Sequence, residues 1–531
     1  MKKLKATLAF TTALCLCTSY LPITEQIQPM INFISASAED EEPATSGECG
    51  ENLTWHLSQN FDENTYTLTI SGTGAMTDWV GTSAPWDGWR DNITKVIIQE
   101  GVTTIGSNAF NGNVWLLFGT YPNLKSVTIP DSVTTIGAYA FYNCISLKSI
   151  TIPDGVTTIG DSAFGGCSAL ESIVIPDGIE TIDDGTFSGC SYLRSVTIPN
   201  SVTLIGANAF EECTALKSIE IPNSVKKIDS YAFENCPNLK SVEIPESVTI
   251  IGEGSFSNCP ALESVTIQNG VEEIRDYAFS GCSSLKSIII PDSVEEIGWG
   301  AFEGCSSLKS VKLPNNISKI NGGIFKDCTA LESIIIPDRV SEIIHHAFDG
   351  CESLTSIIIP NYILKIWEGA FKGCSSLEAI IIPESVQWID QDTFYGCSSL
   401  ESITFENPRC ELILPAIPDN TTIYGYTNST AQGYAEEYKQ KFVALDENQD
   451  TTAPTDPEIL WGDADENGKV EILDVVLMNR VYVGVDKISD SGKKNADSDQ
   501  DGKITLSDSM NILKLLVHLF EQKDFPIQAE S

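Results

Sequence analysis

The chain of 531 residues carries 73 acidic and 32 basic side chains, which gives a formal net charge of −41 at pH 7. So acidic a chain repels polyanions at long range, which argues against nucleic acid and an anionic membrane surface as partners. Hydrophobic residues make up 42% of the chain, enough to bury a large core, and the length predicts several domains.

Residues 1–38 have the pattern of a signal peptide. Three lysines flank the start of an apolar run over residues 4–21, and Ala36-Ser37-Ala38 offers a small-residue cleavage site. The alternative is a membrane anchor, but Ser and Thr interrupt the run and no stop-transfer flank follows it. Cys15 and Cys17 each follow a leucine, which argues against lipidation. We therefore predict a secreted chain with no membrane span.

A repeat of 23 residues runs through positions 101–405. Cysteine recurs at this step from Cys144 to Cys397, and phenylalanine and leucine keep the same step in columns of their own. In each turn the pattern Leu-x-x-Ile-x-Ile predicts a short strand with alternate side chains pointing inward. A proline such as Pro176 ends the strand, because it lacks a ladder donor. No single turn can bury its apolar side, so the repeat predicts a stacked solenoid.

The 16 cysteines of a secreted chain raise the question of disulfides. Equivalent cysteines on adjacent turns would have parallel Cβ vectors, whereas a disulfide requires converging ones. We therefore predict that the cysteine column consists of small buried core residues. Cys49 and Cys410 lie near opposite ends of the solenoid and are not expected to pair with each other.

The repeat consensus Pro-x-Ser/Gly-Val-x-x-Ile-Gly-x-x-Ala-Phe-x-x-Cys-x-x-Leu-x-Ser-Ile-x-Ile resembles the BspA-type leucine-rich repeat of bacterial surface proteins. The resemblance implies a leucine-rich-repeat solenoid, built mainly of short β-strands, over 101–405. It also implies a strand-rich N-terminal cap over 48–100. Residues 406–445 have a strand, short helix, strand pattern and are predicted to form the C-terminal cap, since a solenoid must cover its exposed core ends.

Residues 446–458 carry five carboxylates, two prolines and no basic residue, which predicts a solvated linker. Two segments beyond it, 463–474 and 497–508, match the EF-hand calcium-loop pattern. A solvated acidic turn could imitate one such loop, but two copies that each run into an apolar helical stretch favour two bound Ca²⁺ ions. The predicted ligand positions are Asp463, Asp465, Asn467, Lys469 through its carbonyl, Glu471 and Asp474 in the first loop, and Asp497, Asp499, Asp501, Lys503 through its carbonyl, Thr505 and Asp508 in the second.

Both loops end in Asp, where calcium-sensor EF-hands usually have Glu. This departure is expected of the dockerin family, whose duplicated loop-helix module residues 459–522 resemble. The resemblance implies a small all-α module that binds a cohesin domain of a scaffolding protein, as in a cellulosome. The cohesin-binding positions carried over are Ile472, Leu473, Asn479, Arg480, Leu506, Ser507, Leu513 and Lys514. For Leu506 and Leu513 the alternative is a place in the module's own core.

The outward positions of the repeat strands are candidates for binding. One column is almost entirely serine, and its neighbour changes from Thr and Glu in the early turns to isoleucine in the late ones, at Ile289, Ile335, Ile358 and Ile381. An exposed isoleucine row predicts a partner-binding patch, although isoleucine also suits a half-covered strand. Trp299, Trp367 and Trp388 fall in the same late turns, which favours a partner.

No catalytic pattern emerges. None of the four histidines accompanies a nucleophile in a recognisable motif, and most carboxylates fall in turn columns. We therefore expect a non-catalytic recognition protein, secreted and held in an extracellular, scaffold-bound or cell-surface complex that serves polysaccharide catabolism. Its repeats would bind a protein or a cell-wall ligand. The alternatives are an adhesin for host or matrix proteins, and an unrecognised enzyme or peptidase regulator within the complex.

Overall fold

The computed structural model describes residues 44–61, 64–111, 120–413, 415–446 and 488–498, together with positions 464, 470, 478, 503, 504 and 512. The predicted signal peptide and all of the predicted linker except Asp446 lie outside the described residues. Within the described ranges, no helix combines the length and apolar character that crossing a bilayer requires.

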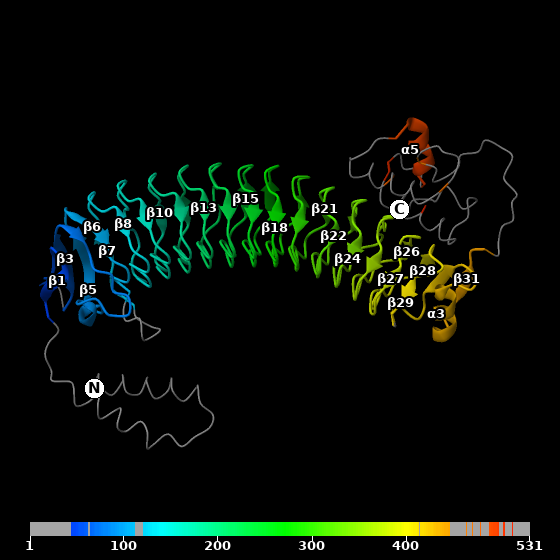
Figure 1. Ribbon diagram of the computed structural model, residues 1–531, viewed down its shortest axis with the longest axis horizontal. Coiled ribbons are helices and arrows are strands. Elements are labelled where there is room, and N and C mark those ends of the chain that lie inside the picture. Colours follow the sequence, from blue (N-terminus) through cyan, green and yellow to red (C-terminus); the bar gives the residue numbers. More distant parts are fainter. Residues whose placement is uncertain are drawn as a thin grey trace, which may run out of the picture. The chain divides into compact units, whose positions relative to one another are not determined.

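Most repeat turns carry two short strands, and strands of successive turns pair in parallel. Ser172 pairs with Ser195, which is 23 residues further along the chain, and the same step recurs throughout the stack. The turns therefore follow one another in a single row (Figure 1), which confirms the predicted solenoid.

Two ladders run along the stack. The first, interrupted at several turns, contains β7 (Ser126–Thr128), β10 (Ser172–Val174), β12 (Ser195–Thr197), β15 (Ser241–Ile244), β17 (Ser264–Ile267), β19 (Ser287–Ile289), β21 (Ser310–Lys312), β23 (Ser333–Ile334), β26 (Ala379–Ile382) and β28 (Ser402–Phe405). The second contains β6 (Val102–Ile105), β8 (Thr135–Ile136), β9 (Thr158–Ile159), β11 (Thr181–Ile182), β13 (Leu204–Ile205), β14 (Lys227–Ile228), β16 (Ile250–Ile251), β18 (Glu273–Ile274), β20 (Glu296–Ile297), β22 (Lys319–Ile320), β24 (Glu342–Ile343), β25 (Lys365–Ile366), β27 (Trp388–Ile389) and β29 (Glu411–Leu412).

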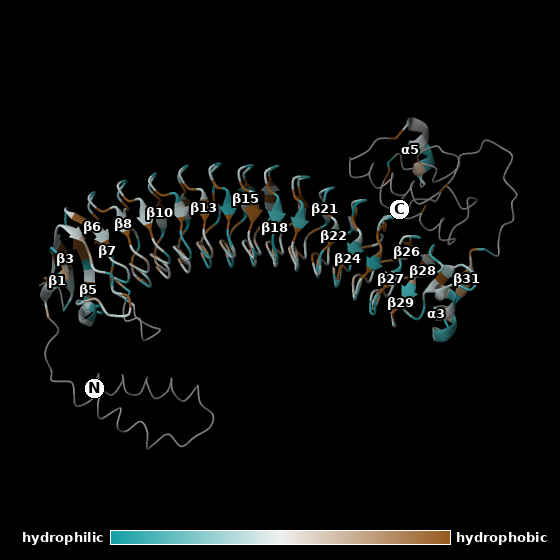
Figure 2. Ribbon diagram, in the orientation of Figure 1, coloured by the Kyte–Doolittle hydropathy of each residue, from teal (hydrophilic) through white to brown (hydrophobic). Residues whose placement is uncertain are grey.

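A tight turn separates the first ladder from the second in each repeat. The carbonyl of Pro153 accepts a hydrogen bond of 3.1 Å from the amide of Val156, and the equivalent bond recurs from turn to turn. Proline suits this position because its missing N–H leaves no ladder donor unpaired and its fixed φ favours a turn. Figure 2 shows hydrophobic and hydrophilic residues alternating in the same way in successive turns.

The interior of the stack is a ladder of phenylalanine rings. Neighbouring rings from Phe110 to Phe394 stack with centroids between 5.1 and 5.8 Å apart. Each ring is fully buried, so it contacts only the turns on either side of it. The stability of one turn therefore depends on its neighbours, as expected for a solenoid.

The cysteine column lies beside this ladder. Every described cysteine is buried and is a free thiol, including Cys49 and Cys410, which confirms the prediction that the column consists of buried core residues. The Sγ–H of Cys259 donates to the carbonyl of Phe233 at 3.3 Å, and this bond recurs along the column. Cysteine thus fills a small core site and also supplies a weak donor to a buried carbonyl.

At the N-terminal end, β1 (Ser46–Gly50), β2 (Leu53–Gln59) and β3 (Tyr66–Gly72) form an antiparallel sheet. This sheet joins the first ladder because β3 pairs in parallel with β5 (Ile93–Ile98), and β5 pairs with β7. The short β4 (Gly74–Ala75) pairs with β6 of the second ladder, and a 3-10 helix, η1 (Asp87–Trp89), lies between β4 and β5. Trp86 is fully buried and stacks on Phe110 at 5.8 Å, so the aromatic ladder ends against this sheet.

The C-terminal end shows the predicted strand, short helix and strand, as β30 (Thr422–Gly425), α3 (Thr430–Tyr438) and β31 (Phe442–Ala444). β30 extends the first ladder by pairing with β28. The Ser429 hydroxyl caps α3 by accepting the amide of Gln432. The Tyr434 hydroxyl accepts the amide of Ile417 at 3.0 Å, which anchors the helix to the last turn.

In the C-terminal region the described residues include one helix, α5 (Asp490–Ala496). Ser489 caps it, since its hydroxyl accepts the amide of Gly492 at 2.8 Å. Ala496 is buried, as are the separate positions Ala464, Met478 and Ile512, and none of the four belongs to the hydrophobic cluster that fills the stack.

Candidate binding surfaces

Of the predicted calcium ligands, the structure describes two. Asp497 follows α5 directly as its C-cap residue, and its amide donates to the carbonyl of Lys493 at 2.9 Å. The helix therefore ends where the second predicted loop begins. Lys503 is exposed. The remaining predicted ligands lie outside the described residues, namely Asp463, Asp465, Asn467, Lys469, Glu471, Asp474, Asp499, Asp501, Thr505 and Asp508.

The predicted cohesin-binding positions also lie outside the described residues, so they stay predictions. They are Ile472, Leu473, Asn479, Arg480, Leu506, Ser507, Leu513 and Lys514.

The predicted isoleucine row lies on the outward side of the first ladder. Ile289 is 65% exposed, but Ile335 and Ile358 are half-buried and Ile381 is only 8% exposed. The prediction of an exposed isoleucine is therefore wrong for Ile381. The reason is a change along the ladder, because the strands alternate between exposed and buried residues at β17, whereas all four residues of β26 and of β28 are buried.

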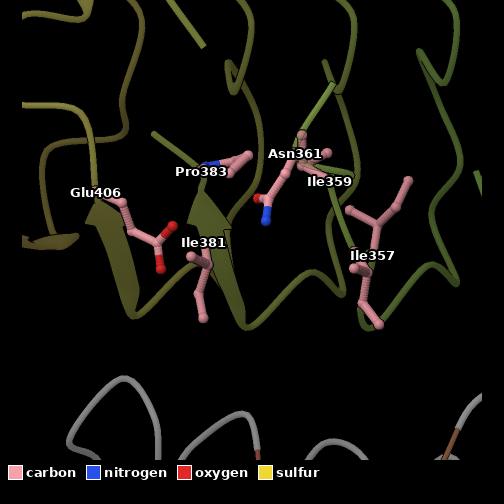
Figure 3. A pocket seen from close by; sticks show the side chains of 7 residues that line it. Ile357, Ile359, Asn361, Ile381, Pro383 and Glu406 are labelled. Atoms are coloured by element: carbon pink, nitrogen blue, oxygen red, sulfur yellow. The ribbon is translucent and has the colours of Figure 1, made fainter. Parts of the chain in front are cut away.

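A small pocket opens at the covered end of this row (Figure 3). Ile358, Ile381, Pro383 and Glu406 line it, together with Ile357, Ile359 and Asn361. Burial raises the pKa of the Glu406 carboxyl, which holds its proton more tightly than a carboxyl in water. The pocket is mainly aliphatic and has one acidic group at its rim.

The three late tryptophans do not share the isoleucine surface. Trp388 is in β27 of the second ladder, and Trp299 and Trp367 follow the second-ladder strands β20 and β25 by two residues and one residue respectively. The Trp367 ring contacts His345 at 5.0 Å between centroids, and the Lys365 ammonium lies 5.4 Å from the centre of the same ring. The sequence placed these tryptophans in the same late repeats as the isoleucines. In the structure they lie in or just after strands of the second ladder, whereas the isoleucines belong to the first.

Trp299 belongs to an edge of the stack that follows the second ladder. Its amide donates to the carboxylate of Asp276 in the preceding turn at 2.7 Å. Tyr277 and Trp299 are 43% and 46% exposed, which is unusual for large rings whose backbones are so firmly bonded. The sequence analysis did not single out Tyr231 and Tyr277. They could have been found from their spacing, because they occupy the same position of the repeat and lie two repeats apart.

The two histidines of the late turns take part in contacts within the stack. Nδ1 of His346 lies 3.0 Å from the Asp349 carboxylate, and His345 packs on Trp367. Both rings therefore have partners within the repeat surface, in keeping with a structural role.

Comparison with known proteins identifies two families in the chain. The model of the BspA type leucine-rich repeat region matches residues 116–240, 203–332 and 319–413, and the dockerin type I domain model matches residues 461–516. Dockerin type I domains bind calcium and attach proteins to cohesins, and leucine-rich repeats recognise proteins. Both families are non-catalytic and typically extracellular or at the cell surface.

No curated protein shows significant sequence similarity to the chain. Among solved structures, a leucine-rich repeat protein from Bacteroides ovatus is 27% identical, with a TM-score of 0.50 over 75% of this chain and 99% of that one. A leucine-rich repeat protein from Eubacterium ventriosum is 25% identical, with a TM-score of 0.43 over 66% of this chain and 94% of that one. A leucine-rich cell surface protein from Faecalibacterium prausnitzii is 28% identical, with a TM-score of 0.39 over 70% of this chain and 96% of that one.

The repeat matches together span more than half of the chain, and the stacked turns, the buried phenylalanine ladder and the unpaired cysteine column agree with them. The chain belongs to the family of proteins with BspA type leucine-rich repeats, and it carries a dockerin type I domain near its C-terminus.

Proposed function

We propose that this protein is a secreted, non-catalytic recognition protein that is held in an extracellular, cellulosome-like complex through a calcium-dependent dockerin–cohesin contact. The observation that carries the proposal is the presence, on one chain, of a repeat stack and a dockerin type I match at 461–516. The stack presents a ligand surface, and the dockerin determines where that surface is held.

Two Ca²⁺ ions occupy the two loops in this proposal. Each loop offers carboxylate oxygens at positions 1, 3 and 12, with a glycine at position 6, and such hard oxygen donors suit calcium. The position of Asp497 directly after α5 supports the second loop. Asp463 holds the first position of the first loop, as Asp497 does in the second. Lys469 and Lys503 each contribute a backbone carbonyl.

The cohesin contact involves the residues that follow the ligands in each loop and on each helix. In the first copy these are Ile472, Leu473, Asn479 and Arg480, and in the second copy Leu506, Ser507, Leu513 and Lys514. Because the copies differ at every one of these positions, we propose that one of the two faces dominates the binding.

On the repeats, we propose that the outward side of the first ladder contacts a protein partner around Ile289 and Ile335. Ile289 is the most exposed member of the row, and the flanking serine column leaves the strip flat and polar. In this proposal a signal peptide at 1–38 directs export, so the repeats contact their partner outside the cell.

The test uses the full secreted chain and immobilised type I cohesin domains. Retention is expected in calcium and is expected to be lost in chelator, and Asp463→Ala plus Asp497→Ala should reproduce the loss. Asp456→Ala in the predicted linker removes the same kind of charge without touching a loop, and should bind as the wild type does. Retention that is the same with and without the chelator would refute the dockerin role.

A further inference from the structure

The edge of the stack beside the second ladder carries a column of residues with left-handed backbone. In four successive turns this column contains Tyr231, Gly254, Tyr277 and Gly300, with φ between 55° and 59°. Glycine adopts this conformation freely, whereas a bulky side chain costs about 1 to 2 kcal/mol there. Side chains also occupy this column in other turns, as Tyr139, Ser162, Asn208, His346 and Asp392, and Tyr231 and Tyr277 are the two members that alternate with glycine over four successive turns.

Each of these tyrosine rings lies over the glycine of the next turn. A Cβ atom at Gly254 would stand 2.6 Å from the ring of Tyr231, and one at Gly300 would stand 2.4 Å from the ring of Tyr277. Trp299 is arranged in the same way, since a Cβ at Gly322 would stand 2.3 Å from its ring. The glycines thus leave the space in which the rings lie along the edge.

The rings are held in place while they stay accessible. The Tyr231 hydroxyl donates to the carboxylate of Glu253, and this bond raises the pKa of Tyr231 to about 12. Tyr277 and Trp299 are linked through a hydrogen bond of 2.7 Å from the Tyr277 amide to the Trp299 carbonyl. A ring that is fixed before binding, as the Tyr231 ring is by Glu253, loses little conformational entropy when a ligand covers it.

Polar groups lie between the rings. An open pocket of about 190 Å³ is lined by Glu253, Arg275, Asp276, Glu296 and Gly298, together with Glu273 and Ile274. Glu253 is the hydrogen-bond partner of Tyr231, and Asp276 accepts the amide of Trp299, so two residues that line this pocket are bonded to aromatic residues of the edge. Arg275 is paired with Glu273 at 3.2 Å, which leaves a mixed set of acceptors and donors facing the opening.

The spacing of the rings restricts the ligand. Successive turns are 5.2 and 5.4 Å apart in this part of the phenylalanine ladder, so Tyr231 and Tyr277 are separated by roughly twice that distance. This length is close to the disaccharide repeat of an extended β-1,4-linked glycan. The flat C–H faces of a pyranose pack on aromatic rings, and its hydroxyl groups donate to carboxylates and accept from guanidinium.

We propose that the edge formed by Tyr231, Tyr277, Trp299 and the intervening pocket binds a neutral β-1,4-linked polysaccharide chain that runs along the stack. The formal net charge of −41 disfavours an acidic polysaccharide, and the alternation of aromatic and polar groups matches a polymer that offers both apolar faces and hydroxyl groups. This inference goes beyond the proposed function, because it assigns a second ligand to a different side of the repeats, and it does not depend on the calcium module.

The test measures retention of the full secreted chain on insoluble β-1,4-glucan, β-1,4-xylan and β-1,4-mannan, with granular starch as a chain of different geometry. Retention is expected on at least one β-linked polymer and not on starch, and it should persist in chelator, unlike cohesin binding. Tyr277→Ala should weaken binding about tenfold, which corresponds to the loss of one aromatic contact. Tyr192→Ala is the matched control, because Tyr192 is 59% exposed in a different column of the turn.

The triple variant Tyr231→Ala, Tyr277→Ala and Trp299→Ala should abolish retention while the thermal transition of the stack persists. If Tyr277→Ala alters that transition, Tyr277→Leu keeps an apolar side chain over Gly300 and should still bind more weakly than wild type. Equal retention of the triple variant and the wild type, failure to bind all three β-linked polymers, or equal retention on starch would each overturn the proposal. Binding that is instead competed away by a basic peptide would assign the acidic pocket to a protein ligand and would also overturn it.

Discussion

The repeat stack and the C-terminal module obtain a core in different ways. In the stack one hydrophobic cluster continues from Cys49 to Ala435, and each ring of the phenylalanine ladder packs on the next. In the module the described buried apolar residues are Ala464, Met478, Ala496 and Ile512, which lie outside that cluster. The dockerin match covers only residues 461–516, and a domain of this length has marginal stability unless a bound ion adds to it. Repetition therefore builds the core of the stack, whereas we expect the stability of the module to depend on bound calcium.

The largest expected effect is the loss of a ring from the middle of the ladder. Phe233 is fully buried between Phe210 and Phe256, with both centroid distances at 5.2 Å. Phe233→Ala should lower the free energy of unfolding by about 3 to 5 kcal/mol, because the cavity cannot collapse between two stacked rings. Urea denaturation measures the change, with exposed Lys240→Ala as the control of little effect. Equal losses for the two variants would contradict the assignment of the inward column.

Calcium removal should act on the other region alone. At a calcium concentration 100 times the dissociation constant, a bound ion contributes about 2.7 kcal/mol to the folded module, and the chelator removes this contribution. We expect hydrogen exchange to accelerate in 461–516 and to stay unchanged in the repeats. Faster exchange along the stack as well would show that the two regions do not differ in their dependence on metal.

A smaller effect is expected where a glycine accommodates a ring. Gly300→Ala should lower stability by about 1 to 2 kcal/mol, because its φ of 58° is unfavourable for alanine, and the new Cβ should also displace Tyr277. Gly433→Ala in α3 is the control of opposite sign, since a Cβ there meets open space and alanine favours a helix interior. Thermal denaturation compares the two variants, and destabilisation by both would contradict the role of the left-handed column.

The smallest effect is expected for thiol reagents on the native chain. Burial raises the pKa of Cys49 and of Cys410 to about 12 and also raises the pKa of Cys190 and Cys213 in the column, so these thiols stay protonated and covered at pH 8. Iodoacetamide should leave the described cysteines unmodified until denaturant is added, as mass spectrometry of the intact protein would show. Native labelling of the column would indicate that the turns open locally, which would weaken the contrast with the module.

The sequence alone determined the features that repeat. The columns of phenylalanine, cysteine and leucine indicated a solenoid, its inward side and the absence of disulfides, because every turn places the same residue in the same environment. The two acidic loops were predicted from local spacing in the same way, since an EF-hand loop takes its calcium ligands from one short segment, and they stay a prediction. These features depend on residues that lie close together in the sequence, within one repeat or one loop.

The tertiary structure decided the features that depend on contacts between turns. Ile381 matches Ile289 in sequence position, yet it is 8% exposed against 65% for Ile289, and all four residues of β26 and of β28 are buried. The rings of Tyr231 and Tyr277 occupy space that a Cβ atom would fill in the next turn, where the residue 23 positions further on is glycine. A side chain's exposure and orientation depend on which atoms lie above and below it in the stack, and a pattern read within one turn does not contain those atoms.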